Sequence, residues 1–247
     1  MAESTIFDDV FRTETEKMPE LTIPLINEVF GTNYPLDTEI IQGRNEHLTK
    51  SGKKITDSYI IIGEKRYHME CQSTEDSTMI LRMIEYDFAI SVEYAEKVHG
   101  VYRMQFPHSC ILYLRGDVRE KTVSMELQFP DNQVVQYKVP VIRIEWYSIK
   151  EILEKDLIML LPFYIMRYEK MKYQLENDEV LREKLFQEYE MIAKYLEQKL
   201  LNCGLEKEFR DMRELISRIV EYSFPESKNI RKGLGEIMGG QVLELES

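Results

Sequence analysis

The hydrophobic pattern of the chain changes near residue 147. Before that point, short runs of β-branched and aromatic residues alternate with polar residues, and they flank one longer segment with helical spacing. After that point, Leu, Ile, Met, Tyr and Phe recur every three or four positions among charged residues, with few helix-breaking residues. The pattern therefore predicts an α/β domain over residues 1–147 and a helical region over residues 148–247.

Two segments with strand-like alternation, residues 55–62 and 66–72, predict a β-hairpin. Between them, residues 63–64 have the composition of a two-residue turn with glycine in the first position. Such a turn would join the two strands directly and thereby set their register.

The length of this turn decides which polar side chains meet. Counting outwards from a two-residue loop places Asp57 directly opposite Glu70, where side chains of an antiparallel pair stand roughly 5 Å apart. A longer loop of four residues would instead place Asp57 opposite Gln72. In either register the three side chains share one face of the sheet with His68, for which we expect a partly exposed position. Two carboxylates at this distance repel each other unless a cation lies between them.

A helix is predicted downstream of the hairpin, over residues 75–98. Its predicted apolar stripe consists of Ile80, Met83, Ile84, Phe88, Val92 and Ala95. Arg82 and Tyr86 lie four positions apart and are predicted on the opposite, polar side. A guanidinium and a phenol held beside a sheet are suited to hydrogen bonding a phosphate, although an ordinary amphipathic surface helix would show the same pattern.

Four further strand-like segments complete the predicted α/β domain. They are residues 110–114, 122–129, 134–139 and 141–146. The helical region begins at Ser148, where the sequence Ser-Ile-Lys-Glu is the signature of a capping box. Turns between its helices are predicted near Asn177 and near Gly204.

Composition narrows the class of protein. A hydrophobic content of 43% in 247 residues is enough for a real core. Cys71, Cys110 and Cys203 are scattered and form neither a disulfide framework nor a zinc motif, and the chain starts without a basic apolar leader. We therefore expect a cytoplasmic protein. The longest apolar run, residues 157–166, is too short to cross a bilayer and contains a proline, so no membrane partner is expected.

The order and spacing of these residues resemble the Rpn family, the recombination-promoting nucleases also called PD-(D/E)XK-nuclease-family transposases. The motifs that carry the resemblance are Phe7-Asp-Asp-Val-Phe11, Asp57, Glu70-x-Gln72, Arg82, Tyr86 and Glu96-Lys-Val-His-Gly100. The resemblance implies a PD-(D/E)XK, or restriction-endonuclease-like, core with a mixed sheet flanked by helices. An α-helical C-terminal extension would follow this core.

The activity that this resemblance implies is metal-dependent DNA endonuclease activity, in recombination or in mobile elements. Asp57 and Glu70 would bind Mg²⁺ or Mn²⁺ together with the backbone carbonyl of Cys71, because hard cations take oxygen ligands. Asp57, Glu70 and Gln72 would be the catalytic residues.

Two further assignments also depend on the resemblance. A further acidic ligand would come from the first helix, where Glu28 is the candidate and Glu20 and Glu39 are alternatives. The broader superfamily has lysine in the last motif position, where this chain has Gln72. An amide can orient a water molecule but brings no positive charge, so we expect a slower or more conditional enzyme.

If DNA is the partner, the chain needs a locally basic segment in spite of its negative net charge. The formal net charge is −12, which would repel a polyanion at long range. Residues 40–66 are locally basic, and Arg44, Lys53 and Lys54 are their candidate DNA contacts, in addition to the phosphate-binding candidates on the helix. The alternative is a solvated loop that makes a turn at residues 51–54.

A second interpretation belongs to a different class of protein. The chain would then be a catalytically inactive relative that serves as a protein-interaction or dimerisation module through its acidic helices. Either interpretation is compatible with a homodimer formed through the C-terminal helices. Residue types alone do not separate the two, since Asp117 and the later Glu126-Leu-Gln128 repeat the same acid and Glu-x-Gln pattern without an arginine-bearing helix after it.

Overall fold

The structure is a computed structural model that describes residues 5–49, 52–116 and 119–239, with side chains described outside residues 46–55. The chain divides into two compact units, residues 1–146 and 147–247, so the division falls one residue before the predicted boundary. Within the described residues, no helix combines the length and the apolar character needed to cross a membrane.

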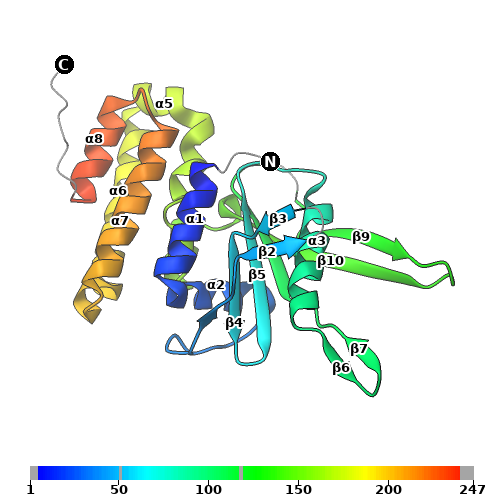
Figure 1. Ribbon diagram of the computed structural model, residues 1–247. Coiled ribbons are helices and arrows are strands. Elements are labelled where there is room, and N and C mark those ends of the chain that lie inside the picture. Colours follow the sequence, from blue (N-terminus) through cyan, green and yellow to red (C-terminus); the bar gives the residue numbers. More distant parts are fainter. Residues whose placement is uncertain (1–4, 50–51, 117–118, 240–247) are drawn as a thin grey trace. The chain divides into compact units, whose positions relative to one another are not determined.

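A mixed sheet lies at the centre of the first unit (Figure 1). It has six strands in the order β1-β4-β5-β8-β10-β9. Its strands are β1 Ile41–Gln42, β4 Ser58–Ile62, β5 Lys65–Gln72, β8 His108–Tyr113, β9 Thr122–Gln128 and β10 Val134–Arg143. β5, β8 and β10 pair in parallel, whereas β1 with β4, β4 with β5, and β9 with β10 pair antiparallel. With its flanking helices, this sheet confirms the predicted mixed α/β class.

Helices and two small hairpins surround this sheet. They are α1 Ile6–Lys17, η1 Pro19–Thr22, α2 Ile23–Phe30, the β2 Glu46–Thr49 and β3 Gly52–Ile55 pair, α3 Met79–Glu93, and the β6 Glu96–Val98 and β7 Val101–Arg103 pair. α3 connects β5 to its parallel neighbour β8, because a tight turn cannot join parallel strands. Met79 and Met83 of α3 share a buried cluster with Ile111 and Val141 of the sheet.

The hairpin between β4 and β5 has the predicted two-residue turn. Ile62 pairs with Lys65, and Gly63 adopts φ +59°, which suits a turn with glycine first. The pairing continues in the same register back to Ser58, the first residue of β4, so Asp57, which precedes it, comes opposite Glu70. The structure therefore confirms the two-residue loop and excludes the four-residue alternative.

The predicted orientation of the helix after the hairpin is wrong. The helix is shorter than residues 75–98, and its buried side carries Tyr86 and Asp87 together with methionines and Ile90. Phe88, predicted on the apolar stripe, is 50% exposed, and Val92 is also exposed. The segment contains two apolar stripes. The stripe that also carries Asp87 faces the sheet, because His68 on β5 is a hydrogen-bond partner for this acid.

β10 also differs from the prediction, in which residues 134–139 and 141–146 are two separate strands. One strand continues through Pro140, and the chain then forms the short 3-10 helix η2, Ile144–Trp146. Pro140 is the last residue of β10 that pairs with β9, and Val141 is the first that pairs with β8. A proline is tolerated here because it lies where the strand changes its partner, and its missing N–H interrupts neither ladder.

The second unit is helical, as predicted. Its elements are α4 Ile149–Glu154, η3 Ile158–Leu160, η4 Tyr164–Met171, α5 Lys172–Asn177, α6 Glu179–Lys199, η5 Leu201–Cys203, α7 Glu206–Ser223 and α8 Lys228–Ile237. Ser148 and Glu151 form the predicted capping box of α4. The predicted turns are confirmed, because Asp178 caps α6 and Gly204 ends η5 with a left-handed φ of +81°.

The turn glycine provides a test of the hairpin register. We predict that Gly63→Val lowers the free energy of unfolding by about 1–2 kcal/mol, because the left-handed conformation disfavours a β-branched residue. A Cβ at this position would meet nothing within 4 Å, so the loss is conformational rather than steric. Gly63→Asn is the matched control and should lose less, since Asn tolerates this region. Equal losses in urea-induced unfolding would contradict the assigned turn.

Candidate functional site

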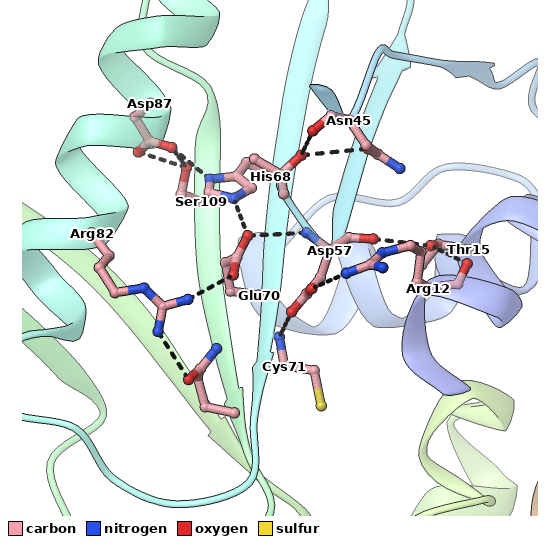
Figure 2. A network of polar contacts seen from close by, with 12 residues as sticks. Arg12, Thr15, Asn45, Asp57, His68, Glu70, Cys71, Arg82, Asp87 and Ser109 are labelled. Carbon is pink, nitrogen blue, oxygen red and sulfur yellow. Dashed lines mark hydrogen bonds and ion pairs between the residues drawn. The ribbon is translucent and has the colours of Figure 1, made fainter. Parts of the chain in front are cut away.

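The hairpin brings Asp57 and Glu70 together at the point where β4 begins and β5 approaches its end. The backbone N–H of Asp57 donates to Oε1 of Glu70 at 3.1 Å, and the N–H of Cys71 donates to Oδ2 of Asp57 at 3.0 Å (Figure 2). Asp57 is 5% exposed and Glu70 is 1% exposed. Each carboxylate therefore accepts a hydrogen bond from the backbone of the opposite strand, which holds the two acids together.

The backbone N–H and C=O groups of Cys71 also point towards Asp57. Within a strand, the N–H and C=O of one residue point to the same side, and those of the next residue point to the other side. The N–H of Cys71 binds Asp57, whereas the C=O of Gln72 accepts a hydrogen bond from Leu114, beyond β8. The carbonyl of Cys71 therefore lies on the Asp57 side of β5, as the predicted ligand set requires.

Helix α1 contributes a cation to this site. Nη2 of Arg12 lies 3.2 Å from Oδ1 of Asp57, and the hydroxyl of Thr15 donates to the Asp57 carbonyl at 3.4 Å. The Arg12 side chain is 28% exposed, so this ion pair reaches solvent on one side. The sequence pattern had not indicated either contact, because Arg12 and Asp57 are 45 positions apart.

His68 is buried completely, and the prediction of a partly exposed histidine is wrong. Its Nε2 lies 2.9 Å from Oε1 of Glu70, and its Nδ1 lies 2.7 Å from Oδ1 of Asp87 on α3 (Figure 2). Burial alone would lower the pKa of His68, but the hydrogen bonds to Asp87 and Glu70 outweigh burial and raise this pKa to about 10. The imidazole is therefore a buried cation that donates to two carboxylates at neutral pH.

Asp87 is anchored in turn by the sheet. Ser109 Oγ on β8 donates to both of its carboxylate oxygens at 2.7 Å, and the hydroxyl of Tyr137 on β10 donates to Oδ2. All three partners of Asp87 come from different strands. This convergence explains why a charged residue occupies the sheet-facing side of α3.

Arg82 lies beside the same acids, as the helix prediction requires. Its Nη1 donates to Oε1 of Gln72 at 3.3 Å, and its Nη2 lies 3.9 Å from Oε2 of Glu70. The Arg82 side chain is 36% exposed, so the guanidinium bridges the buried acids and solvent. Tyr86, by contrast, is buried in a T-shaped contact with the His68 ring, and a hydrogen bond links it to Arg82. Its predicted role as an exposed phosphate contact does not match this position.

The site contains equal numbers of acidic and cationic side chains, but the cations do not cancel the effects that raise the pKa of Asp57. Asp57, Glu70 and Asp87 face the cations of the network, which are Arg12, His68 and Arg82. Burial, followed by repulsion from Glu70 and Asp8, nevertheless raises the pKa of Asp57 well above its ordinary value. The N–H of Cys71 and the Arg12 guanidinium act in the opposite direction and do not cancel this rise. Additional positive charge near Asp57 would therefore be bound favourably.

The candidates for a further acidic ligand lie on elements other than β4 and β5. Glu28 lies on α2, and the alternatives Glu20 and Glu39 lie in η1 and in the segment before β1. Across the described parts of the chain, no three His, Cys, Asp or Glu side chains form a group that could hold a metal ion by themselves.

The basic segment has a different structure from the predicted turn. Residues 52–55 form strand β3, which pairs with β2, and Arg44 lies exposed in the segment before this hairpin. The side chains of Lys53 and Lys54 lie outside the described residues. Their proposed contact with DNA remains a prediction from the sequence.

Glu14 on α1 is a buried acid that the sequence reasoning missed. It is completely buried, and neither of its carboxylate oxygens has a hydrogen-bond partner among the described residues. Burial raises the pKa of Glu14 well above its ordinary value. Burial is also the main cause of the raised pKa of the Cys71 thiol, to which nearby acids including Glu14 add. A signal was present, because Glu14 falls on the same helical stripe as the buried Phe7, Val10 and Phe11.

Comparison of the chain with protein-family models, with curated proteins and with solved structures gives no match. The resemblance to the Rpn family therefore rests on the residues and motifs of this sequence.

The buried carboxyl of Glu14 makes stability depend on pH in a predictable direction. Because its pKa is raised in the folded chain, the protonated form stabilises the fold at low pH, and this contribution is lost as pH rises through the raised pKa. We predict that Glu14→Gln reduces the loss of unfolding free energy between pH 5 and pH 8. Urea unfolding at the two pH values measures it. Glu16→Gln, an exposed substitution on the same helix, is the control and should match the parent.

Proposed function

We propose that the chain is a metal-dependent DNA endonuclease with a PD-(D/E)XK-like core. The observation that supports this proposal most strongly is the pairing of Asp57 and Glu70 across the β4–β5 hairpin, with the Cys71 backbone between them and Arg82 at the solvent side. The mixed sheet, with its two flanking helices that both reach the site, is compatible with such a core.

The donor set of the site suits Mg²⁺ or Mn²⁺. Asp57, Glu70 and the carbonyl of Cys71 supply oxygen ligands, and few protein ligands are needed because Mg²⁺ keeps several waters. The pKa of Asp57 is raised first by burial and then by repulsion from Glu70 and Asp8, and a dication would offset that repulsion. When bound, the metal would supply an acidified water and would stabilise negative charge on the scissile phosphate.

Gln72 and Arg82 would act as a unit on the substrate. Arg82 donates to the amide oxygen of Gln72, so the amide N–H groups of Gln72 remain as donors. In this arrangement Gln72 donates to a phosphate oxygen or a water, and Arg82 supplies the positive charge that an amide lacks. The two residues together would perform the positioning for which the broader superfamily uses lysine.

One observation favours the second candidate function, a catalytically inactive interaction module. Both acids already have protein cations as partners, since Arg12 lies against Asp57 and His68 against Glu70. A network closed in this way could serve only the stability of the fold. The helical unit would then carry the function, for instance through a homodimer.

A plasmid-nicking assay separates these two functions. We predict that the parent nicks supercoiled DNA with Mg²⁺ or Mn²⁺, and that Asp57→Asn and Glu70→Gln each lower the rate about 100-fold or more, because loss of metal-assisted charge stabilisation removes several kcal/mol from the barrier reduction. Glu126→Gln is the matched control. This exposed acid lies on β9 in the second Glu-x-Gln sequence and should leave nicking unchanged.

Nicking at the same rate in the parent, in both site variants and in the control would refute the assigned site. A parent that neither nicks DNA nor binds Mn²⁺ would favour the interaction module instead.

Arg82 should contribute to DNA binding through a phosphate contact. We predict that Arg82→Gln weakens DNA binding and lowers the slope of log affinity against log salt by roughly one. Fluorescence anisotropy of a labelled duplex over a series of salt concentrations measures both effects. Lys184→Gln removes the same charge from an exposed position on α6 and serves as the control. An unchanged slope for Arg82→Gln would exclude Arg82 from the binding surface.

A further inference from the structure

The two carboxylate oxygens of Glu70 have different surroundings. Oε1 accepts hydrogen bonds from the Asp57 N–H at 3.1 Å and from His68 Nε2 at 2.9 Å. Oε2 lies 3.9 Å from the Arg82 guanidinium, which is beyond hydrogen-bond distance. One oxygen is therefore held by the protein, and the other is directed towards the half-exposed side of the site.

The hydrogen bonds that hold Oε1 of Glu70 continue beyond His68. His68 Nδ1 is held by Asp87, and Asp87 is held by Ser109 and Tyr137 from two further strands. Every hydrogen-bonding atom of the imidazole is thereby used, and the ring has no freedom to turn away from Glu70. α3, β5, β8 and β10 together determine the orientation of a single carboxylate.

We propose that His68 and Asp87 are positioning residues that hold Glu70 with Oε1 bound to the protein and Oε2 presented to the divalent metal. The inference rests on the proposed function. It adds a chain of hydrogen bonds from α3 that fixes the orientation of the metal ligand Glu70. Partners behind a metal ligand fix its orientation, and their loss commonly weakens metal binding about 10- to 100-fold. A residue of purely structural importance would change folding stability without this selective effect on the metal.

The two nitrogens of His68 can be tested separately with a matched pair of amides. The side-chain nitrogen of Gln is the same number of bonds from Cα as Nε2, and that of Asn corresponds to Nδ1. His68→Gln therefore preserves the donor to Glu70, whereas His68→Asn preserves only the donor to Asp87. Both variants remove the buried imidazole, so general effects on the core are similar.

The measurement is the dissociation constant of Mn²⁺ for the full chain without DNA, obtained from the electron paramagnetic resonance signal of free Mn²⁺. We expect His68→Asn to raise this constant about 10- to 100-fold. His68→Gln keeps the donor to Glu70 but loses the bond to Asp87, so we expect it to raise the constant only about threefold. Circular dichroism shows whether each variant is folded. Equal dissociation constants for the two folded variants would overturn the inference.

Tyr137→Phe provides an independent variant in case the amide variants fail to fold. It removes one hydrogen bond to Asp87 and leaves His68 and Glu70 intact. We expect a smaller weakening of Mn²⁺ binding, about threefold, and an unchanged constant would overturn the inference. If the parent binds Mn²⁺, such a negative result leaves the proposed function in place. A parent that binds no Mn²⁺ would overturn both.

Discussion

The buried imidazolium of His68 is the interaction on which this site and the packing of α3 depend. It lies between Glu70 on the sheet and Asp87 on the helix, and none of the three side chains has appreciable exposure to solvent. Removing one partner from a buried ion pair commonly costs about 3–5 kcal/mol, because the remaining charge has no water around it. The fold can therefore place Asp87 on the sheet-facing side of α3 because His68 supplies a cation there and Ser109 and Tyr137 supply further hydrogen bonds.

At the α1 end of the same network, Asp57 is less well compensated than the acids around His68. Asp57 is held by Arg12, which reaches solvent, and its pKa is raised because burial and the nearby Glu70 outweigh that partner. The helix that supplies Arg12 also buries Glu14 without a hydrogen-bond partner among the described residues. The α1 side thus holds two carboxyl groups whose pKa is raised mainly by burial, whereas the acids on the α3 side have the His68 cation as a partner. A cation beside Asp57 would favour its ionised form, and the proposed function requires such a cation.

Several features of the fold could be predicted because they depend on neighbouring residues. The turn at Gly63 sets the hairpin register, and the Ser148 capping box starts the first helix of the second unit. The burial of His68 could not be predicted in this way, since strand alternation shows only which face it occupies. The orientation of α3 was predicted incorrectly because its sequence has two apolar stripes, and Phe88 lies on the one that faces solvent.

The sequence by itself therefore determined the α/β class of the first unit, the helical second unit and the pairing of Asp57 with Glu70, all of which follow from local periodicity and turn geometry. Only the tertiary structure decided which charges neutralise these acids. Arg12, which pairs with Asp57, comes from a helix 45 positions earlier. His68, which pairs with Glu70, is held in turn by Asp87 from a helix after the hairpin. Long-range contacts of this kind leave no periodic signal, because they depend on how separate elements pack and on which buried charges find partners there.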